Sequence, residues 1–183
     1  MTNEKAIVYR NKIDTLENEV KKERDRFKKA KPNEKDEIKK KIDSLEKDID
    51  KTYESLFKEF DEDIELKSID EMNEQSILFS EFFGRYLVRL DLSTSQIRNV
   101  YGDVMRLKMK GFSSNELMLL KPRLAYTTER KGTDGSRKFR EKIENALDKV
   151  IFIEDKSKQE TLFQNFANFF EAILAYHRSF GGK

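Results

Sequence analysis

The amino-acid sequence predicts an all-α protein, and three observations carry that prediction. Apolar residues recur at alternating spacings of three and four over most of the chain, as on a helix with one buried face. Four segments begin with Ser followed three residues later by Glu or Gln, a helix start signal that satisfies free backbone N–H groups. Strand-like alternation is lacking, and Val150 to Ile153 is the only short β-like run.

Composition favours one folded domain of ordinary size, or a small domain that carries an extension. The chain has 183 residues, which is short for two unrelated domains. Charged residues make up 39%, but 14 Phe and 6 Tyr supply enough bulky apolar surface for a packed core. We therefore do not expect a disordered chain.

The scarcity of cysteine and histidine excludes many chemistries. With no Cys and one His, the sequence cannot form disulfides, zinc ribbons, iron–sulfur clusters, thiol nucleophiles or multi-histidine metal sites. We read His177 as structural, and the acidic residues Asp61 to Glu65 as a solvated helix end. We expect no catalytic residue, metal or cofactor, and, because no long apolar run or export signal occurs, a soluble cytoplasmic protein that does not contact membranes.

Residues 1–72 predict an antiparallel, coiled-coil-like helical hairpin. Lys31-Pro32-Asn33 interrupts the apolar pattern, and Asn33 is expected to cap the second helix. Each helix would extend about 40 Å at 1.5 Å per residue. The expected seam residues are Ala6, Tyr9, Ile13, Leu16, Val20, Glu23, Phe27 and Ala30 on the first helix and Ile38, Ile42, Leu45, Ile49, Thr52 and Leu56 on the second.

Residues 73–183 predict a compact bundle of about five helices, the second of two domains. The four start signals place helix beginnings at Ser68, Ser93, Ser113 and Ser157. Gly111 is expected to end the helix that follows Ser93, and Pro122 to kink or restart the chain after Ser113. A loop is expected from Lys131 to Ser136. The last helix is apolar around much of its circumference, which predicts a central position, and Gly181-Gly182 ends it.

The two predicted domains differ in charge. Residues 1–72 hold 18 basic and 21 acidic residues, whereas residues 73–183 hold 19 and 14. Within the second domain, residues 85–142 hold 14 basic and 6 acidic residues, a net charge of +8. This local basic field is compatible with nucleic-acid backbone binding, and equally with an ordinary solubilising surface.

Several basic residues are candidates for phosphate contacts. Arg98, Arg106 and Lys110 share the polar side of one predicted helix, and Gly102 leaves that side uncluttered. Tyr101 and Tyr126 could stack on bases, but their apolar faces favour core packing. Further candidates from the charge pattern are Lys121, Arg123, Arg130, Lys131, Arg137, Lys138, Arg140 and Lys142.

Three segments together resemble the small subunit of the type III-A CRISPR effector, the Csm complex. They are STSQIR at 93–98, LKPRLAY at 120–126 with Arg130 following, and FFEAILAYH at 169–177 before the terminal glycines. Their order, spacing and C-terminal position agree with that family over about residues 75 to 182. Each motif alone is weak, but three in order make a chance match improbable.

The resemblance implies a non-catalytic protein whose copies stack head to tail as the inner filament of the complex. The implied partners are guide RNA, target RNA, the backbone subunit, the large subunit and copies of the chain itself. By similarity, Arg98, Lys121, Arg123 and Arg130 would contact phosphates, while Arg106, Lys131, Arg137 and Lys138 rest on charge alone. The competing hypothesis is a structural coiled-coil adaptor that binds only proteins; an enzyme is a distant third.

The sequence departs from the family at two places. Glu129 stands where a glycine often precedes the basic residue matched by Arg130, and an acid there would repel phosphate. The segment 1–72 is usually much shorter in the family. Its role stays open between a self-association arm, a lever against neighbouring subunits and a passive insertion, and the coiled-coil seam favours the first.

Overall fold

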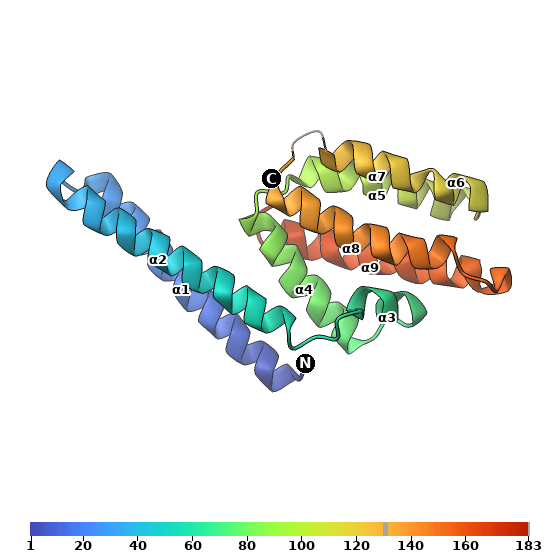
Figure 1. Cartoon of the computed structure of the whole chain (residues 1–183), viewed down its shortest axis with the longest axis horizontal. Helices are drawn as coiled ribbons and strands as arrows, with labels where there is room; N and C mark the ends of the chain where they lie inside the picture. The colour runs from blue at the N-terminus through green and yellow to red at the C-terminus, as the bar shows by residue number, and fades with distance from the viewer. Residues whose placement is uncertain (130–131, 183) are drawn as a thin grey trace. The chain divides into compact units, whose positions relative to one another are not determined.

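The computed structural model describes residues 1–129 and 132–182, and every regular element in these ranges is helical (Figure 1). The all-α prediction is therefore confirmed. The chain forms two compact units, residues 1–62 and 63–183; the domain boundary expected after residue 72 stays a prediction. The elements are α1 (Asn3–Lys29), α2 (Pro32–Phe57), α3 (Ile64–Asp70), α4 (Glu74–Arg89), α5 (Thr94–Lys110), α6 (Ser114–Met118), α7 (Leu120–Glu129), α8 (Asp134–Ile151), the 3₁₀ turn η1 (Lys156–Lys158) and α9 (Gln159–Ser179).

The first unit is the predicted antiparallel hairpin of α1 and α2 (Figure 1). Two ion pairs join the two helices, Arg24 to Glu46 and Lys41 to Glu23, and a third links Lys5 to Glu59 just after α2, each with an N–O distance of 2.6 Å. The apolar seam and these flanking pairs fix the two helices against each other. Buried seam residues are Ala6, Ile13 and Val20 on α1 and Ile38, Leu45 and Ile49 on α2.

The cap predicted at Asn33 is wrong. Helix α2 begins at Pro32, and the backbone N–H of Lys31 donates to Glu34 Oε2 at 3.2 Å. Proline suits the first position of a helix because its fixed φ angle is helical and its missing N–H would lack a partner there in any case. Asn33 therefore lies inside the first turn.

The second unit is a bundle arranged around α9, as predicted for the last helix. Helix α9 packs against α3, α4, α5 and α8, and Figure 1 shows it running beside α8. Its phenylalanines fill the core: Phe163, Phe166, Phe169 and Phe170 are at most 1% exposed. Helix α5 packs on α9 and helix α7 on α8, and α5 and α7 also pack on each other.

Two of the four predicted helix starts are confirmed. The Ser93 N–H donates to Gln96 Oε1 at 3.3 Å before α5, and Ser113 Oγ accepts from the Glu116 N–H at 3.4 Å before α6. The start at Ser68 is wrong, because Ser68 lies inside α3 and its hydroxyl donates to the Ile64 carbonyl at 2.7 Å.

Other residues begin the remaining helices. Asn73 caps α4 by accepting from the Ser76 N–H at 3.1 Å. The start predicted at Ser157 is also wrong, since Ser157 lies in η1, which Asp155 caps, and α9 begins at Gln159. Helix α8 begins at Asp134, within the expected loop, because Thr133 accepts from the Ser136 N–H at 3.1 Å.

The helix ends follow the predicted chemistry. Gly111 ends α5 with a φ angle of +96°, which suits glycine because it lacks a Cβ. Pro122 lies in the first turn of α7, after the chain restarts at Leu120, so the restart is confirmed. At the end of α9, Gly181 and Gly182 donate to the carbonyls of Arg178 and His177 at 3.1 and 3.0 Å, the hydrogen-bond pattern of a Schellman motif.

The acidic segment after the hairpin differs from expectation. Glu65 was predicted to lie at a solvated helix end, yet it is 3% exposed. Its Oε1 accepts from Lys142 Nζ at 3.0 Å and from Asn145 Nδ2 at 3.3 Å, both on α8. The correction follows from packing, since α3 lies against α8 and turns Glu65 inward. Among the helices of the described residues, none is long and apolar enough to cross a bilayer.

Candidate nucleic-acid interface

A shallow groove of about 420 Å³ lies between α5 and α7. Asn99 and Asp103 line it from α5, and Arg123 and Tyr126 from α7, together with Pro122 and Thr127. Helix α7 positions its two side chains here because Leu120, Leu124 and Thr128 face the core at every fourth residue. The groove is therefore open to solvent, on the side of α7 away from its buried stripe.

Tyr126 is exposed in this groove, which corrects the prediction that it packs in the core. Its side chain is 74% exposed, because the buried stripe of α7 lies on the other side of the helix. Tyr101 instead meets the edge of Phe170 with ring centroids 5.6 Å apart. Burial, followed by the nearby charge of Glu171, raises the pKa of Tyr101 above its ordinary value. The core interpretation thus fits Tyr101 and fails for Tyr126.

Two arginines of the groove share one carboxylate. Arg123 Nη1 donates to Asp103 Oδ1 at 2.9 Å, and Arg106 Nη2 lies 3.3 Å from the same oxygen. Each guanidinium carries five N–H donors, so one contact with Asp103 leaves others for a second anion. Asp103 thereby holds both arginines at the groove without using all of their donors.

Arg98 extends the same side of α5 by two turns. It is exposed and, among the described residues, has no ion pair. Between Arg98 and Arg106 lies Gly102, where an added Cβ would meet no atom within 4 Å. The strip from Arg98 to Arg106 is therefore accessible to a polymer backbone that approaches along α5.

Lys121 faces a different partner. Its Nζ lies 2.6 Å from Asp148 Oδ1 on α8 and 5.9 Å from the ring centroid of Phe152. Lys121 and Arg123, neighbours in the same motif, thus turn toward different helices, α8 and α5. The sequence could not separate them, because the partners Asp148 and Asp103 are distant along the chain.

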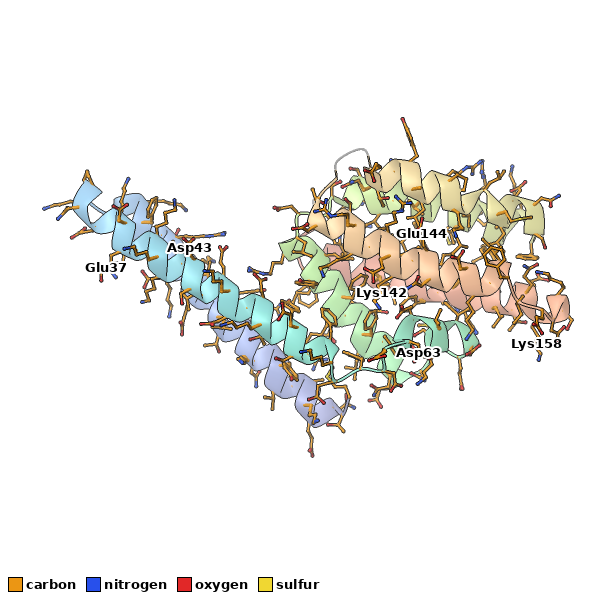
Figure 2. The ribbon with its side chains drawn as sticks, viewed as in Figure 1. Glu37, Asp43, Asp63, Lys142, Glu144 and Lys158 are labelled. Carbon is orange, nitrogen blue, oxygen red and sulfur yellow. The ribbon has the colours of Figure 1, made fainter. Side chains whose placement is uncertain are left out.

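The basic residues of α8 lie apart from the groove. Arg137 donates to the Gly132 carbonyl at 2.8 Å and pairs with Asp134, while Lys138 Nζ lies 5.8 Å from the ring centroid of Tyr86. Further along, Lys142 reaches α3 whereas Glu144 borders a second hollow between α7 and α8, so the two lie on opposite sides of α8 (Figure 2). Arg130 and Lys131 lie outside the described residues.

The predicted site residues therefore fall into separate groups. Arg106 and Arg123 meet at Asp103 beside the α5–α7 groove, and Arg98 is exposed on α5, whereas Lys121, Arg137 and Lys138 face other elements. Sequence reasoning missed the groove residues Asn99, Asp103 and Thr127. One signal was available, since Asp103 stands three residues before Arg106, a spacing at which helix side chains pair.

The candidate metal and general-base residues also lie in the part of the chain that the structure describes. No group of three or more His, Asp or Glu side chains there is placed to hold a metal ion. His177 is buried, and its Nε2 lies 2.8 Å from the Leu92 carbonyl, so the ring serves the core. Burial lowers the pKa of His177, and the hydrogen bond to Leu92 opposes that shift.

These features define the class of the protein as an all-helical bundle with paired arginines at a surface groove. The family model described as Csm2 Type III-A matches residues 70–183, well over half of the chain. The chain therefore belongs to the Csm2 family, the small subunit of the type III-A CRISPR complex, and the predicted resemblance is confirmed. No curated protein and no solved structure gives a significant match. The hairpin of α1 and α2 precedes the matched residues.

Proposed function

We propose that this chain is a non-catalytic subunit that holds the guide–target RNA duplex by its phosphate backbone. Several copies would stack as the inner filament beside the backbone subunits, near the large subunit, while other subunits cleave nucleic acid. Membership of the Csm2 family supports a place in the complex. The finer assignment rests on the surface chemistry of the bundle.

The α5–α7 groove is the observation that carries this proposal. Arg123 lines it and Arg106 contacts the same Asp103, both with spare N–H donors, while Arg98 is exposed on α5. The exposed Tyr126 offers a ring and a hydroxyl. Arginine binds phosphate through charge-assisted hydrogen bonds, and such contacts are independent of base sequence. Base pairing between guide and target would read the sequence, and several weakly binding copies would act together.

The predicted phosphate contacts differ in what supports them. Arg98 is exposed and, among the described residues, has no ion pair. Arg106 and Arg123 are paired with Asp103, Lys121 with Asp148 and Arg137 with Asp134, so each of these four would have to share its charge with a phosphate. Lys138 is exposed beside Tyr86. Arg130 and Lys131 stay predictions from the sequence.

The first test is the double variant Arg98→Glu, Arg123→Glu of the full chain. Fluorescence anisotropy with a guide–target RNA duplex, titrated across salt, is expected to show at least about tenfold weaker binding and a log–log salt slope shallower by about two. A matched control, Lys158→Glu with Arg178→Glu, makes the same change in net charge away from the groove. Unchanged RNA affinity of the groove variant, both alone and inside the reconstituted particle, would refute the assignment.

One observation favours the adaptor hypothesis, in which the chain binds only proteins. Arg106, Lys121, Arg123 and Arg137 all have carboxylate partners within the bundle, as expected if these charges serve stability and solubility. The adaptor predicts that Lys121→Glu with Arg123→Glu leaves both the assembled particle and its RNA content intact. The phosphate-binding proposal predicts an assembled particle that retains less RNA.

A further inference from the structure

The hairpin is electrically polarised along its length, although its overall charge is zero. Its distal half, defined as residues 21–41 on both sides of the turn, holds 11 basic and 5 acidic residues, a net charge of +6. Its basal half, residues 1–20 and 42–62, holds 6 basic and 12 acidic residues, a net charge of −6. This segment precedes the residues matched by the family model, so the family does not explain its charge.

The basic side chains of the distal half reach solvent from both helices. Lys22 on α1 and Lys39 and Lys40 on α2 are exposed, and within residues 1–62 none of the three has an ion pair. Other cations of this half are held across the hairpin, as Arg24 is by Glu46. Figure 2 shows side chains projecting at the turn end of both helices, with Glu37 among them.

Helix stability accounts for only part of this charge. Arg26, Lys28 and Lys29 occupy the last turn of α1, where cations interact favourably with the helix dipole. Lys22 lies two turns before that end. Lys39 and Lys40 lie two turns into α2, beyond the first turn to which the dipole effect is confined. The unpaired lysines therefore have no evident role in stabilising the hairpin.

The chemistry of the distal half fits a polyanion better than a protein partner. Protein interfaces need apolar or aromatic anchors at their centre, and lysine is depleted there. The strongly exposed large apolar residues of the hairpin, Ile7 and Val8, both belong to the basal half. Flexible, fully solvated lysines without an anchor suit an electrostatic contact with regularly spaced phosphates.

We propose that the distal half of the hairpin binds the phosphodiester backbone of nucleic acid. The contact is independent of base sequence, and the acidic basal half repels phosphates, so that binding is confined to the turn end. This site is separate from the α5–α7 groove and does not depend on the function proposed for that groove. It gives the hairpin a role other than self-association.

The test compares two triple variants of the full chain that change net charge equally. Lys22→Glu, Lys39→Glu, Lys40→Glu removes distal charge, and Lys12→Glu, Lys47→Glu, Lys51→Glu removes exposed basal charge. Anisotropy with an RNA duplex across salt should show the log–log slope falling by about two to three for the distal variant, with affinity at least about tenfold lower at low salt. The basal variant should stay within about twofold of the wild type.

The proposal is overturned if the distal variant binds RNA like the wild type. It is also overturned if both triple variants weaken binding equally, because net charge alone would then explain the loss. A change in sedimentation of the distal variant with unchanged RNA binding would assign the surface to a second copy and also overturn the proposal. The neutral variant Lys22→Gln, Lys39→Gln, Lys40→Gln, checked for helicity by circular dichroism, should show a similar loss of slope. A combined variant distinguishes the two proposals. If Arg98→Glu, Arg123→Glu still binds RNA and the added distal changes abolish that binding, the distal half binds RNA independently of the groove.

Discussion

His177 lies at the centre of the bundle with one of its two ring nitrogens satisfied. Its Nε2 lies 2.8 Å from the Leu92 carbonyl, so Nε2–H donates and Nδ1, which is buried without a partner, is unprotonated. Gly182 covers the ring so closely that an added Cβ would lie 2.1 Å from Cε1. A proton on Nδ1 would therefore have neither water nor an acceptor.

The stability of the fold should depend on pH through this residue. Burial holds the pKa of His177 below its ordinary value of 6.5, so below about pH 6.5 the unfolded chain binds a proton that the folded chain refuses. Stability is then lost as pH falls from 6.5 toward the folded-state pKa. In urea unfolding, the wild type should lose more stability between pH 7.5 and 5.5 than His177→Gln, whose amide can still donate to Leu92. Parallel losses in the two proteins would contradict this assignment.

At the scale of elements, α4 and α9 approach each other at Gly84. A Cβ added there would lie 2.8 Å from the backbone nitrogen of His177 and 2.9 Å from the Ile173 carbonyl oxygen. Backbone atoms cannot move aside as a flexible side chain would. The close contact of α4 and α9 thus depends on the absence of one methyl group at Gly84.

Two glycine-to-alanine variants should shift stability in opposite directions. Gly84→Ala is expected to destabilise the chain by more than about 2 kcal/mol, despite the better helix propensity of alanine, because the two helices must separate. Gly102→Ala, in the middle of α5 with no atom within 4 Å of the added Cβ, should stabilise it by up to about 1 kcal/mol. Urea unfolding of the pair measures both, and a neutral Gly84→Ala would show that the helices have room.

The sequence was sufficient for elements defined by local chemistry. The spacing of apolar residues predicted the hairpin and the central last helix. Pro122 and the terminal glycines mark a helix restart and a helix end through their own backbone chemistry, so these were predictable too. Start signals failed where packing decided: Ser68 has the correct partner three residues on, yet α3 buries it within a helix. The pairing of Arg123 with Asp103 and of Lys121 with Asp148 was not predictable, because each joins residues 20 or more apart.

At the scale of the whole molecule, the contacts of α3 determine which N-terminal boundary gives a stable fragment of the bundle. It packs on α8 and α9 and contributes Glu65, which pairs with Lys142, and Asp70, which pairs with Lys149. Ile64 and Ile69 add buried apolar surface. A boundary placed after Met72 removes all of these contacts from the bundle.

Two truncations should therefore differ. Residues 63–183 are expected to fold with high helicity and a cooperative urea transition, whereas residues 73–183 should be less stable by more than about 3 kcal/mol, because Lys142 and the core lose their partners. Circular dichroism during urea unfolding compares them directly. Equal stability of the two fragments would assign α3 to the hairpin side of the chain.

Asp103, held between Arg106 and Arg123, already supplies the negative charge that a phosphate would bring to the groove. In the proposed function, a phosphate at this groove would share the two arginines with Asp103, and would not fill a vacant positive site. Small, weakly bound ions such as chloride compete poorly with a carboxylate that the fold holds in place. A polymer that presents many phosphates at once would compete well, so the carboxylate held by the fold would favour polyanions over small ions.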